Sequence, residues 1–126
     1  MEKYLKVFLV EDSATFARSL ADAVLDIPRV RLLGQASSIK SAKEQLSLDW
    51  PELLILDFKL PDGNAVYLLN WIRASGVAMV CVVFTGYPYP EYRRLCIAAG
   101  ADYFFEKDRD NDRLLQLIAE LSAHSL

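Results

Sequence analysis

The most constraining stretch of this sequence is a run of four aliphatic residues, Leu53–Leu56, that ends on the carboxylate of Asp57. A strand with apolar residues on both faces is typical of the buried centre of a parallel sheet. Pro61 and Gly63 follow closely and favour an exit into a turn. Open α/β sheets hold their functional groups at the carboxyl ends of such strands. Asp57 is therefore a candidate functional residue, although taken alone it is more simply explained as a strand terminator or cap.

Short apolar segments alternate with amphipathic segments along the whole chain. Helix signals include a candidate N-cap at Ser13, a stop at Pro28 and a proline suited to a first helical turn at Pro90. Five strands alternating with five helices predict an α/β fold, a flavodoxin-like doubly wound parallel sheet with strand order 2-1-3-4-5. Residues 1–126 are expected to form a single domain. We predict strands at residues 5–10, 30–35, 53–56, 77–84 and 101–106, and helices at 14–27, 39–46, 64–74 and 90–99. A last helix, capped by Asn111 or Asp112, is predicted to include residues 114–121.

Polar side chains follow four of the five predicted strands. Glu11 and Asp12 end the first strand, Asp57 the third, Thr85 the fourth and Lys107 the fifth. The predicted strand order brings these ends to one crevice. Clustered carboxylates repel one another unless a cation bridges them, and hard oxygen ligands suit Mg²⁺ or Mn²⁺. A metal ion, a lysine and a hydroxyl can neutralise the oxygens of an approaching phosphoryl group, and a carboxylate can accept that group covalently.

Composition argues against several other classes of function. The net charge is −3 and no basic cluster is present, so a nucleic-acid-binding face is not expected. The longest apolar run, residues 77–84, is too short to cross a bilayer, and no signal peptide fits before the first strand. A cytoplasmic protein without membrane contact is therefore expected. Cys81 and Cys96 are predicted to be buried free thiols, and the single histidine, His124, gives little support to histidine-based catalysis.

Four segments resemble the signatures of one family, the receiver domain of response regulators in two-component signal transduction. They are residues 10–13 (VEDS), 56–63 (LDFKLPDG), 84–86 (FTG) and 99–107 (AGADYFFEK). The spacing between the segments is also that of the family, and the resemblance covers essentially the whole chain.

The resemblance implies a phosphorylation-activated switch rather than an enzyme that acts on other molecules. Asp57 would accept a phosphoryl group from a sensor histidine kinase, a histidine phosphotransfer protein or a small phosphodonor. Asp12, Asp57 and the backbone carbonyl of Lys59 would bind Mg²⁺ directly, and Glu11 would bind it through water. These four residues form the metal site that the resemblance predicts.

The resemblance also implies a route by which phosphorylation reaches a protein-binding surface. Lys107 would contact the acyl phosphate, and Thr85 would swing inward to form a hydrogen bond with it. Phe104 matches the aromatic position that follows this hydroxyl. The movement would alter the face formed by the fourth helix, the fifth strand and the fifth helix, which would bind a downstream protein or a second copy of the chain.

Two departures from the family pattern affect geometry and rate. The family commonly has a proline, with a cis peptide, after its lysine, whereas Asp108 follows Lys107. Because a cis bond before a residue other than proline costs about 2.5–4 kcal/mol, we expect the Lys107–Asp108 bond to be trans. The residue after the switch threonine is usually alanine and is Gly86 here.

Two long side chains are placed to affect the lifetime of a phosphoryl group. By resemblance, Lys59 and Tyr87 flank the path of the water that would hydrolyse it, and Pro88 holds Tyr87 extended. We therefore expect slow hydrolysis. The tyrosine-rich loop at residues 87–92 is expected to extend the protein-binding face, although a rigid turn with local packing explains it as well.

Three alternatives are open at this point. A phosphatase of the haloacid-dehalogenase type also phosphorylates an aspartate, but it needs a second acid where Lys59 stands. A receiver-like domain could bind partners without phosphorylation, although the complete set of acids, hydroxyl and lysine argues against this. The chain could also be the receiver part of a longer DNA-binding regulator. The start at Met1 and the absence of a trailing linker favour a stand-alone protein.

Overall fold

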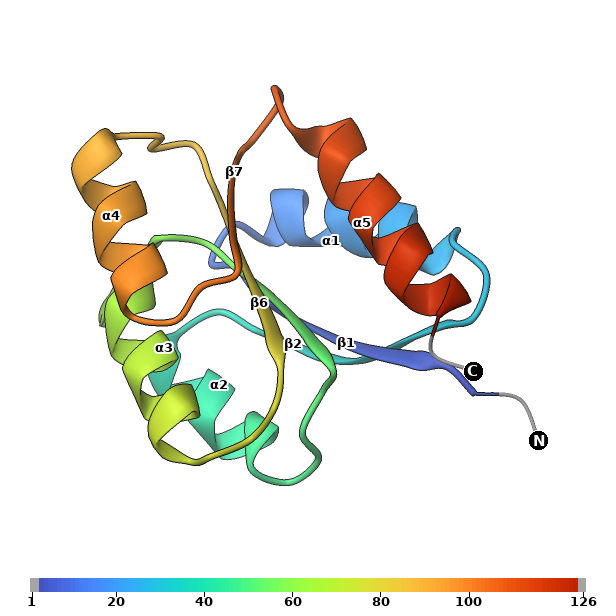
Figure 1. Ribbon diagram of the computed structural model, residues 1–126, viewed down its shortest axis with the longest axis horizontal. Helices are drawn as coiled ribbons and strands as arrows, with labels where there is room; N and C mark the ends of the chain where they lie inside the picture. The colour runs from blue at the N-terminus through green and yellow to red at the C-terminus, as the bar shows by residue number, and fades with distance from the viewer. Residues whose placement is uncertain (1–2, 125–126) are drawn as a thin grey trace.

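The computed structural model describes residues 3–124 and contains one central sheet with helices on both faces (Figure 1). Five helices alternate with the strands of this sheet, as the periodicity of the sequence predicts. The elements follow in the order β1 (Leu5–Val10), α1 (Ala14–Leu25), β2 (Val30–Ala36), α2 (Ile39–Leu46), β3 (Leu53–Leu56), β4 (Lys59–Leu60), β5 (Gly63–Asn64), α3 (Ala65–Ala74), β6 (Val80–Thr85), α4 (Pro90–Ala98), β7 (Tyr103–Glu106) and α5 (Asn111–Ala123).

The central sheet is parallel throughout and has the order β2-β1-β3-β6-β7. Since β4 and β5 form a separate two-stranded antiparallel pair, this order is the predicted 2-1-3-4-5. The flavodoxin-like fold is confirmed. The small pair β4–β5 lies directly after Asp57 and shapes the loop that leaves the central strand.

Two apolar cores lie on opposite faces of the sheet. One contains side chains from α2, α3 and α4, including Leu46, Leu69 and Cys96, and the other contains side chains from α1 and α5, including Val24 and Ile118. Figure 1 shows the same division, with α2, α3 and α4 on one side of the strands and α1 and α5 on the other. All four residues of β3 are buried, as their continuous apolar run predicts.

Helix starts follow the predicted capping chemistry, with one exception. Ser13 accepts a hydrogen bond from the Phe16 backbone N–H, and Ser38 caps α2 in the same way. The predicted cap of the last helix is wrong, because α5 begins at Asn111 and its N-cap residue is Asp110. The side chains there have other partners: Asp110 accepts from the Glu106 N–H and Asn111 accepts from the Asp108 N–H.

Two strands begin later in the structure than the sequence predicts. The strand expected at residues 77–84 begins at Val80, and that expected at 101–106 begins at Tyr103. Strands exist only where a neighbour pairs with them. Val80 pairs with Leu53, the first residue of β3, so residues 77–79 have no partner in that strand. Local hydropathy cannot locate such a limit.

Both cysteines are free and buried in the described structure, as predicted. Burial raises the pKa of the Cys81 thiol to about 11 and that of Cys96 to about 12. Both thiols therefore stay protonated at neutral pH and serve as small apolar core residues.

No helix within residues 3–124 is both long enough and apolar enough to cross a membrane.

Arg73 connects the segments that lead into β6 and β7, at the end of the sheet opposite the polar strand ends. Its guanidinium donates hydrogen bonds to the carbonyl oxygens of Gly100 (2.6 Å from Nη2) and Met79 (2.9 Å from Nη1). It also pairs with the carboxylate of Asp102 at 3.1 Å. Gly100 has a φ of 110°, and a Cβ there would lie 2.7 Å from Arg73 Cγ. The arginine cannot move aside without losing these hydrogen bonds.

We expect Gly100→Ala to lower the free energy of unfolding by about 1–3 kcal/mol, through backbone strain and the clash with Arg73. Gly86→Ala is the matched control, because a Cβ there meets nothing within 4 Å and its φ lies outside the left-handed region. That change should be neutral or stabilise by up to about 1 kcal/mol. Urea unfolding of both variants measures the difference, and equal effects would contradict the strain at Gly100.

Candidate functional site

Three carboxylates meet where β1 and β3 end. Glu11 and Asp12 follow β1, and the Asp57 backbone N–H donates to the Val10 carbonyl at 3.0 Å, which fixes Asp57 beside them. One carboxylate oxygen from each of the three acids lies within 4.8 Å of the others. Glu11 and Asp57 are each only 7% exposed, whereas Asp12 is exposed to solvent. The predicted acidic cluster is present, with two buried members and one open to ligands.

Lys107 supplies positive charge to the two buried acids. Its Nζ lies 2.9 Å from Asp57 Oδ2 and 2.5 Å from Glu11 Oε1. Burial acts to lower the pKa of Lys107, but the hydrogen bonds to Glu11 and Asp57 outweigh it and raise that pKa above its ordinary value. Burial, with the nearby Asp57 charge, raises the pKa of Glu11 despite the lysine.

The turn after Lys107 differs from the proline-containing turn that is common in the family. The Lys107 N–H donates to the Thr85 carbonyl at 2.9 Å, which continues the alignment of β6 with β7. No peptide bond in the described chain is cis, so the expectation of a trans Lys107–Asp108 bond is confirmed. Asp108 instead adopts a φ of 71°, and its N–H donates to Asn111 Oδ1. Lys107 therefore reaches the crevice without the proline.

Thr85 and Phe104 lie where β6 and β7 pair. Thr85 is fully buried, and its hydroxyl accepts a hydrogen bond from the Tyr87 N–H at 3.1 Å. Phe104 is buried next to α4, and its carbonyl accepts a hydrogen bond from Arg93 at 3.2 Å. The Arg93 guanidinium carbon also lies 6.0 Å from the centre of the Phe104 ring. Phe104 is thus connected to α4 through Arg93.

Lys59 and Tyr87 contact each other in the structure. The Lys59 Nζ lies 4.2 Å from the centre of the Tyr87 ring, a cation–π distance. Lys59 is exposed, and Tyr87 is 40% exposed. The two residues predicted to flank the phosphoryl site therefore form one unit, which joins the loop after β3 to the loop after β6.

Asp62 has a role that the sequence did not indicate. Its carboxylate accepts hydrogen bonds from the backbone N–H groups of Ile39 (2.8 Å) and Lys40 (3.0 Å), at the start of α2. These bonds lower the pKa of Asp62. The loop after Asp57 is therefore anchored to a helix more than twenty residues earlier in the chain, a contact with no local sequence signal.

Phe58 forms a second contact that sequence reasoning missed. Its backbone N–H donates to Asp57 Oδ1 at 2.6 Å, and its ring stacks on Tyr92 of α4 with centroids 4.0 Å apart. Tyr89 meets the same Tyr92 ring edge-on. The aromatic loop at residues 87–92 therefore packs partly against the residue that follows Asp57, which agrees with the local-packing explanation of this loop.

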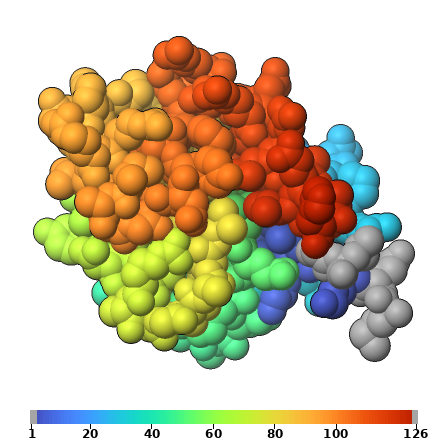
Figure 2. Space-filling model, in the orientation of Figure 1, coloured from blue at the N-terminus to red at the C-terminus, as the bar shows by residue number. Residues whose placement is uncertain are grey.

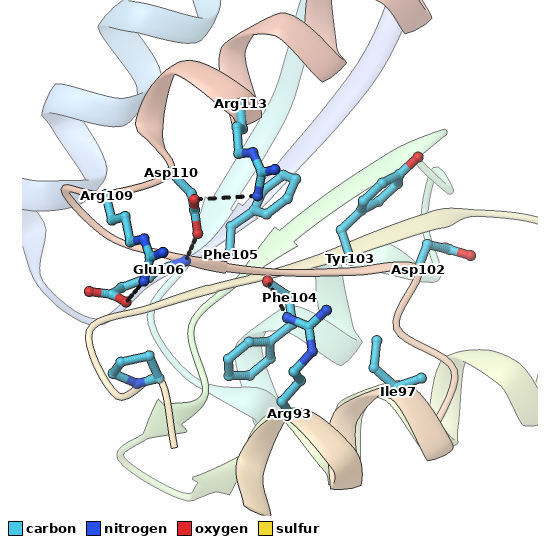
Figure 3. Close-up of a pocket in the computed structure, with 11 residues that line it drawn as sticks. Arg93, Ile97, Asp102, Tyr103, Phe104, Phe105, Glu106, Arg109, Asp110 and Arg113 are labelled. Atoms are coloured by element: carbon cyan, nitrogen blue, oxygen red, sulfur yellow. Dashed lines mark hydrogen bonds and ion pairs between the residues drawn. The ribbon is translucent and has the colours of Figure 1, made fainter. Parts of the chain in front are cut away.

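A shallow pocket lies between α4, β7 and α5 (Figure 3). Three arginines, Arg93, Arg109 and Arg113, point into the region around it, and two of them pair with acids. Arg109 lies 3.9 Å from Glu106, and Arg113 lies 3.7 Å from Asp110. In the space-filling view these three elements lie side by side across one face of the molecule (Figure 2). The face has a mixed charge pattern with the apolar Ile97 and Tyr103 within it.

The donor set at the strand ends fits a hard divalent cation. Carboxylate oxygens are the ligands that Mg²⁺ prefers, and three converge here. Two of them are buried, where an uncompensated negative charge is costly. The Lys107 ammonium compensates part of this charge, and the exposed Asp12 leaves one side of the cluster accessible.

Comparison with known proteins agrees with this geometry. The chain is 29% identical over 119 residues to the DNA-binding transcriptional activator DevR/DosR of Mycobacterium tuberculosis, a match that covers 94% of this chain and 55% of that protein. It is 25% identical to the nitrate/nitrite response regulator protein NarL of Escherichia coli, over 93% of this chain and 54% of that protein. The chain thus spans about half the length of these curated relatives.

Solved structures show the same fold. A CheY-like response regulator receiver domain protein from Methanospirillum hungatei superposes with a TM-score of 0.84 at 21% identity, covering 96% of this chain and 95% of that one. The response regulator domain of Thermotoga maritima CheB gives a TM-score of 0.84 at 19% identity, covering 96% and 98%.

The model of one family, the response regulator receiver domain, matches residues 7–119 and includes every candidate site residue. The chain therefore belongs to the response regulator receiver family of two-component signal transduction.

Proposed function

We propose that this chain is a phosphorylation-activated switch and that Asp57 is its phosphoryl acceptor. The observation that carries the proposal is the buried Asp57 carboxylate, whose Oδ2 is paired with Lys107 beside two further acids. An anionic carboxylate and an anionic phosphoryl group repel each other, so transfer to Asp57 needs nearby positive charge to neutralise the phosphoryl oxygens. Lys107 supplies part of that charge. The expected cytoplasmic location is consistent with this role and is part of the proposal.

The proposed reaction is a simple transfer at phosphorus. An Asp57 carboxylate oxygen attacks, an acyl phosphate P–O bond forms, and the bond to the donor breaks. Acetyl phosphate leaves acetate, and a phosphohistidine of a sensor kinase or phosphotransfer protein leaves an imidazole whose nitrogen takes a proton. Lys107 then directs its N–H donors to the new phosphoryl oxygens. In the structure the Thr85 hydroxyl accepts a hydrogen bond from the Tyr87 N–H. After transfer this hydroxyl turns to the phosphoryl group.

Mg²⁺ would suit the acidic cluster, and Asp12, Asp57 and the Lys59 carbonyl would hold it directly, with Glu11 acting through water. When bound, the ion supplies positive charge that offsets the charge of the phosphoryl oxygens. Asp12 is accessible for this role because it is exposed. Glu11 is less accessible because its two oxygens already accept hydrogen bonds, one from Lys107 and one from the Ser13 N–H.

The proposed output surface is the face formed by α4, β7 and α5. Phe104 lies within β7 and lines the pocket of Figure 3, and Arg93 connects it to α4. A change at Thr85 can therefore reach this face through adjacent packing. Its mixed charges and apolar centre suit a downstream protein or a second copy of the chain. Nucleic acid is not expected to bind this domain.

One alternative has specific support: the chain can be the receiver part of a longer DNA-binding regulator. The relatives DevR/DosR and NarL are about twice its length, and DevR/DosR is described as DNA-binding. In that case the output face would contact an attached domain instead of a separate protein.

The organisation of residues 1–126 as one independent domain stays a prediction, and so does a receiver-like domain that binds partners without phosphorylation. A haloacid-dehalogenase type of phosphatase has little support, because an exposed lysine, Lys59, occupies the place of the required acid.

Treatment with acetyl phosphate and Mg²⁺ should add one phosphoryl group to the chain, and Asp57→Asn should abolish the addition because the amide cannot form an acyl phosphate. Intact-protein mass spectrometry measures the mass increase. Asp49→Asn is the control, since Asp49 is an exposed acid paired with Lys6. Undiminished labelling of Asp57→Asn would refute the assignment, and beryllofluoride binding would then show whether the crevice accepts a phosphoryl mimic at all.

Asp12→Asn should weaken Mg²⁺ binding by about tenfold or more, which corresponds to a loss of roughly 1.4 kcal/mol for one direct carboxylate ligand. Glu11→Gln should weaken it less, because the two Glu11 oxygens already accept hydrogen bonds from Lys107 and Ser13 and Glu11 would reach the ion only through water. Calorimetric titration of the two variants provides the comparison. Equal losses of affinity would show that both acids are direct ligands.

Tyr87→Ala should speed the loss of phosphate from Asp57 by about 3- to 10-fold at fixed Mg²⁺, because the Tyr87–Lys59 unit would no longer cover the path of the attacking water. Tyr89→Ala is the matched control, since Tyr89 is on the same loop but contacts Tyr92 instead. Phosphate release after removal of the donor gives the rate. A Tyr87→Ala rate equal to that of the wild type would show that the ring does not shield the phosphoryl group.

A further inference from the structure

The Lys107 ammonium has a third neighbour besides its two carboxylates. Its Nζ lies 4.1 Å from the centre of the Phe16 ring, within cation–π distance. The Lys107 side chain is only 16% exposed. Phe16 also borders the surface depression at the mouth of the crevice, together with Gly86 and Asp108. No motif in the sequence assigns a role to Phe16.

The position of the Phe16 ring is fixed by segments that carry other site residues. Ser13, which directly follows Asp12, caps α1 by accepting the Phe16 backbone N–H. The ring packs against Phe84, the residue before Thr85, with centroids 5.8 Å apart. The ring therefore belongs to the same rigid frame as Asp12 and Thr85.

Lys107 needs such a support because its side chain has four rotatable bonds and a compact charge. The proline that commonly follows this lysine in the family is absent, and Asp108 takes its place with a φ of 71°. The turn after β7 is thus held by a hydrogen bond from the Asp108 N–H to Asn111 Oδ1 and not by a proline ring in the backbone. A contact at the ammonium itself compensates for a less constrained backbone.

An aromatic face suits this support better than a further acid would. The ring attracts the ammonium through its quadrupole and occupies no N–H donor in a fixed direction. The donors of Lys107 stay directed at Glu11 and Asp57 in the present structure. After phosphoryl transfer, the same donors can turn to phosphoryl oxygens while the ring still holds the charge in place.

We propose that Phe16 is a positioning residue, whose ring face holds the Lys107 ammonium against Asp57 for phosphoryl transfer. The role rests on the proposed function, because transfer to Asp57 is the reaction that Lys107 serves. Phe16 touches neither the donor nor the reacting oxygen, and it acts through the lysine.

The first test is the rate constant of phosphorylation by acetyl phosphate at saturating Mg²⁺. Phe16→Leu removes the ring and should lower this rate by roughly 2- to 30-fold, the range that cation–π strengths imply. Phe16→Trp restores an aromatic face and should keep most of the rate. Trp71→Leu is the matched control, because it removes a half-buried aromatic ring of α3 that lies 5.7 Å from another ammonium, Lys43 Nζ, outside the crevice, and it should leave the rate unchanged.

A series of fluorinated phenylalanines at position 16 separates electrostatics from shape. Each added fluorine weakens the negative ring face while the ring keeps nearly its full size. The phosphorylation rate should fall progressively from phenylalanine to the trifluorinated residue. A flat series would overturn the proposal, because a merely structural ring would behave in that way.

A double-mutant cycle in urea tests the contact without any phosphoryl transfer. Phe16→Leu and Lys107→Gln should be non-additive, with a coupling of roughly 2- to 30-fold in the unfolding equilibrium constant. The role of Phe16 would be overturned if the two substitutions had additive effects on stability and the fluorine series were flat. If the wild-type chain were labelled normally in that case, the proposed function would stay intact. Failure of the wild-type chain to be labelled would overturn both.

Discussion

The buried ion pair between Lys107 and the two carboxylates is the interaction on which the whole crevice depends. Glu11 and Asp57 are buried, and removing one partner of a buried charge pair typically costs several kcal/mol. Lys107 is 96 positions from Glu11 in the chain. It reaches the two carboxylates only because β7 pairs with β6 and β6 pairs with β3. The order of the strands thus places the positive charge that offsets the cost of burying Glu11 and Asp57.

The same arrangement makes the crevice sensitive to added negative charge. A phosphoryl group on Asp57 would compete with Glu11 for the donors of Lys107.

Aromatic side chains surround the polar centre. Phe16 contacts Lys107. Phe58 donates its backbone N–H to Asp57, and its ring stacks on Tyr92. Because Tyr92 belongs to α4, a displacement at Asp57 has a second packed route to that helix besides Thr85 and Phe104.

Most of the architecture could be predicted from local patterns, and the failures have a common cause. Continuous apolar runs located the strands, and the candidate N-cap Ser13 located the start of α1. The start of β6 at Val80 and the cap of α5 at Asp110 were not predictable, because each depends on a partner elsewhere. Strand limits follow the neighbouring strand, and a capping side chain can be taken by another N–H group.

The sequence by itself determined the fold class, the strand order and which acids, hydroxyl and lysine lie at the strand ends, because residue periodicity and chain connectivity restrict these features strongly. Only the tertiary structure decided what surrounds each group. It placed Phe16 on Lys107, Tyr87 on Lys59 and Asp62 at the start of α2. These contacts join residues on separate loops and helices, and their geometry follows from packing in three dimensions, which no spacing along the chain records.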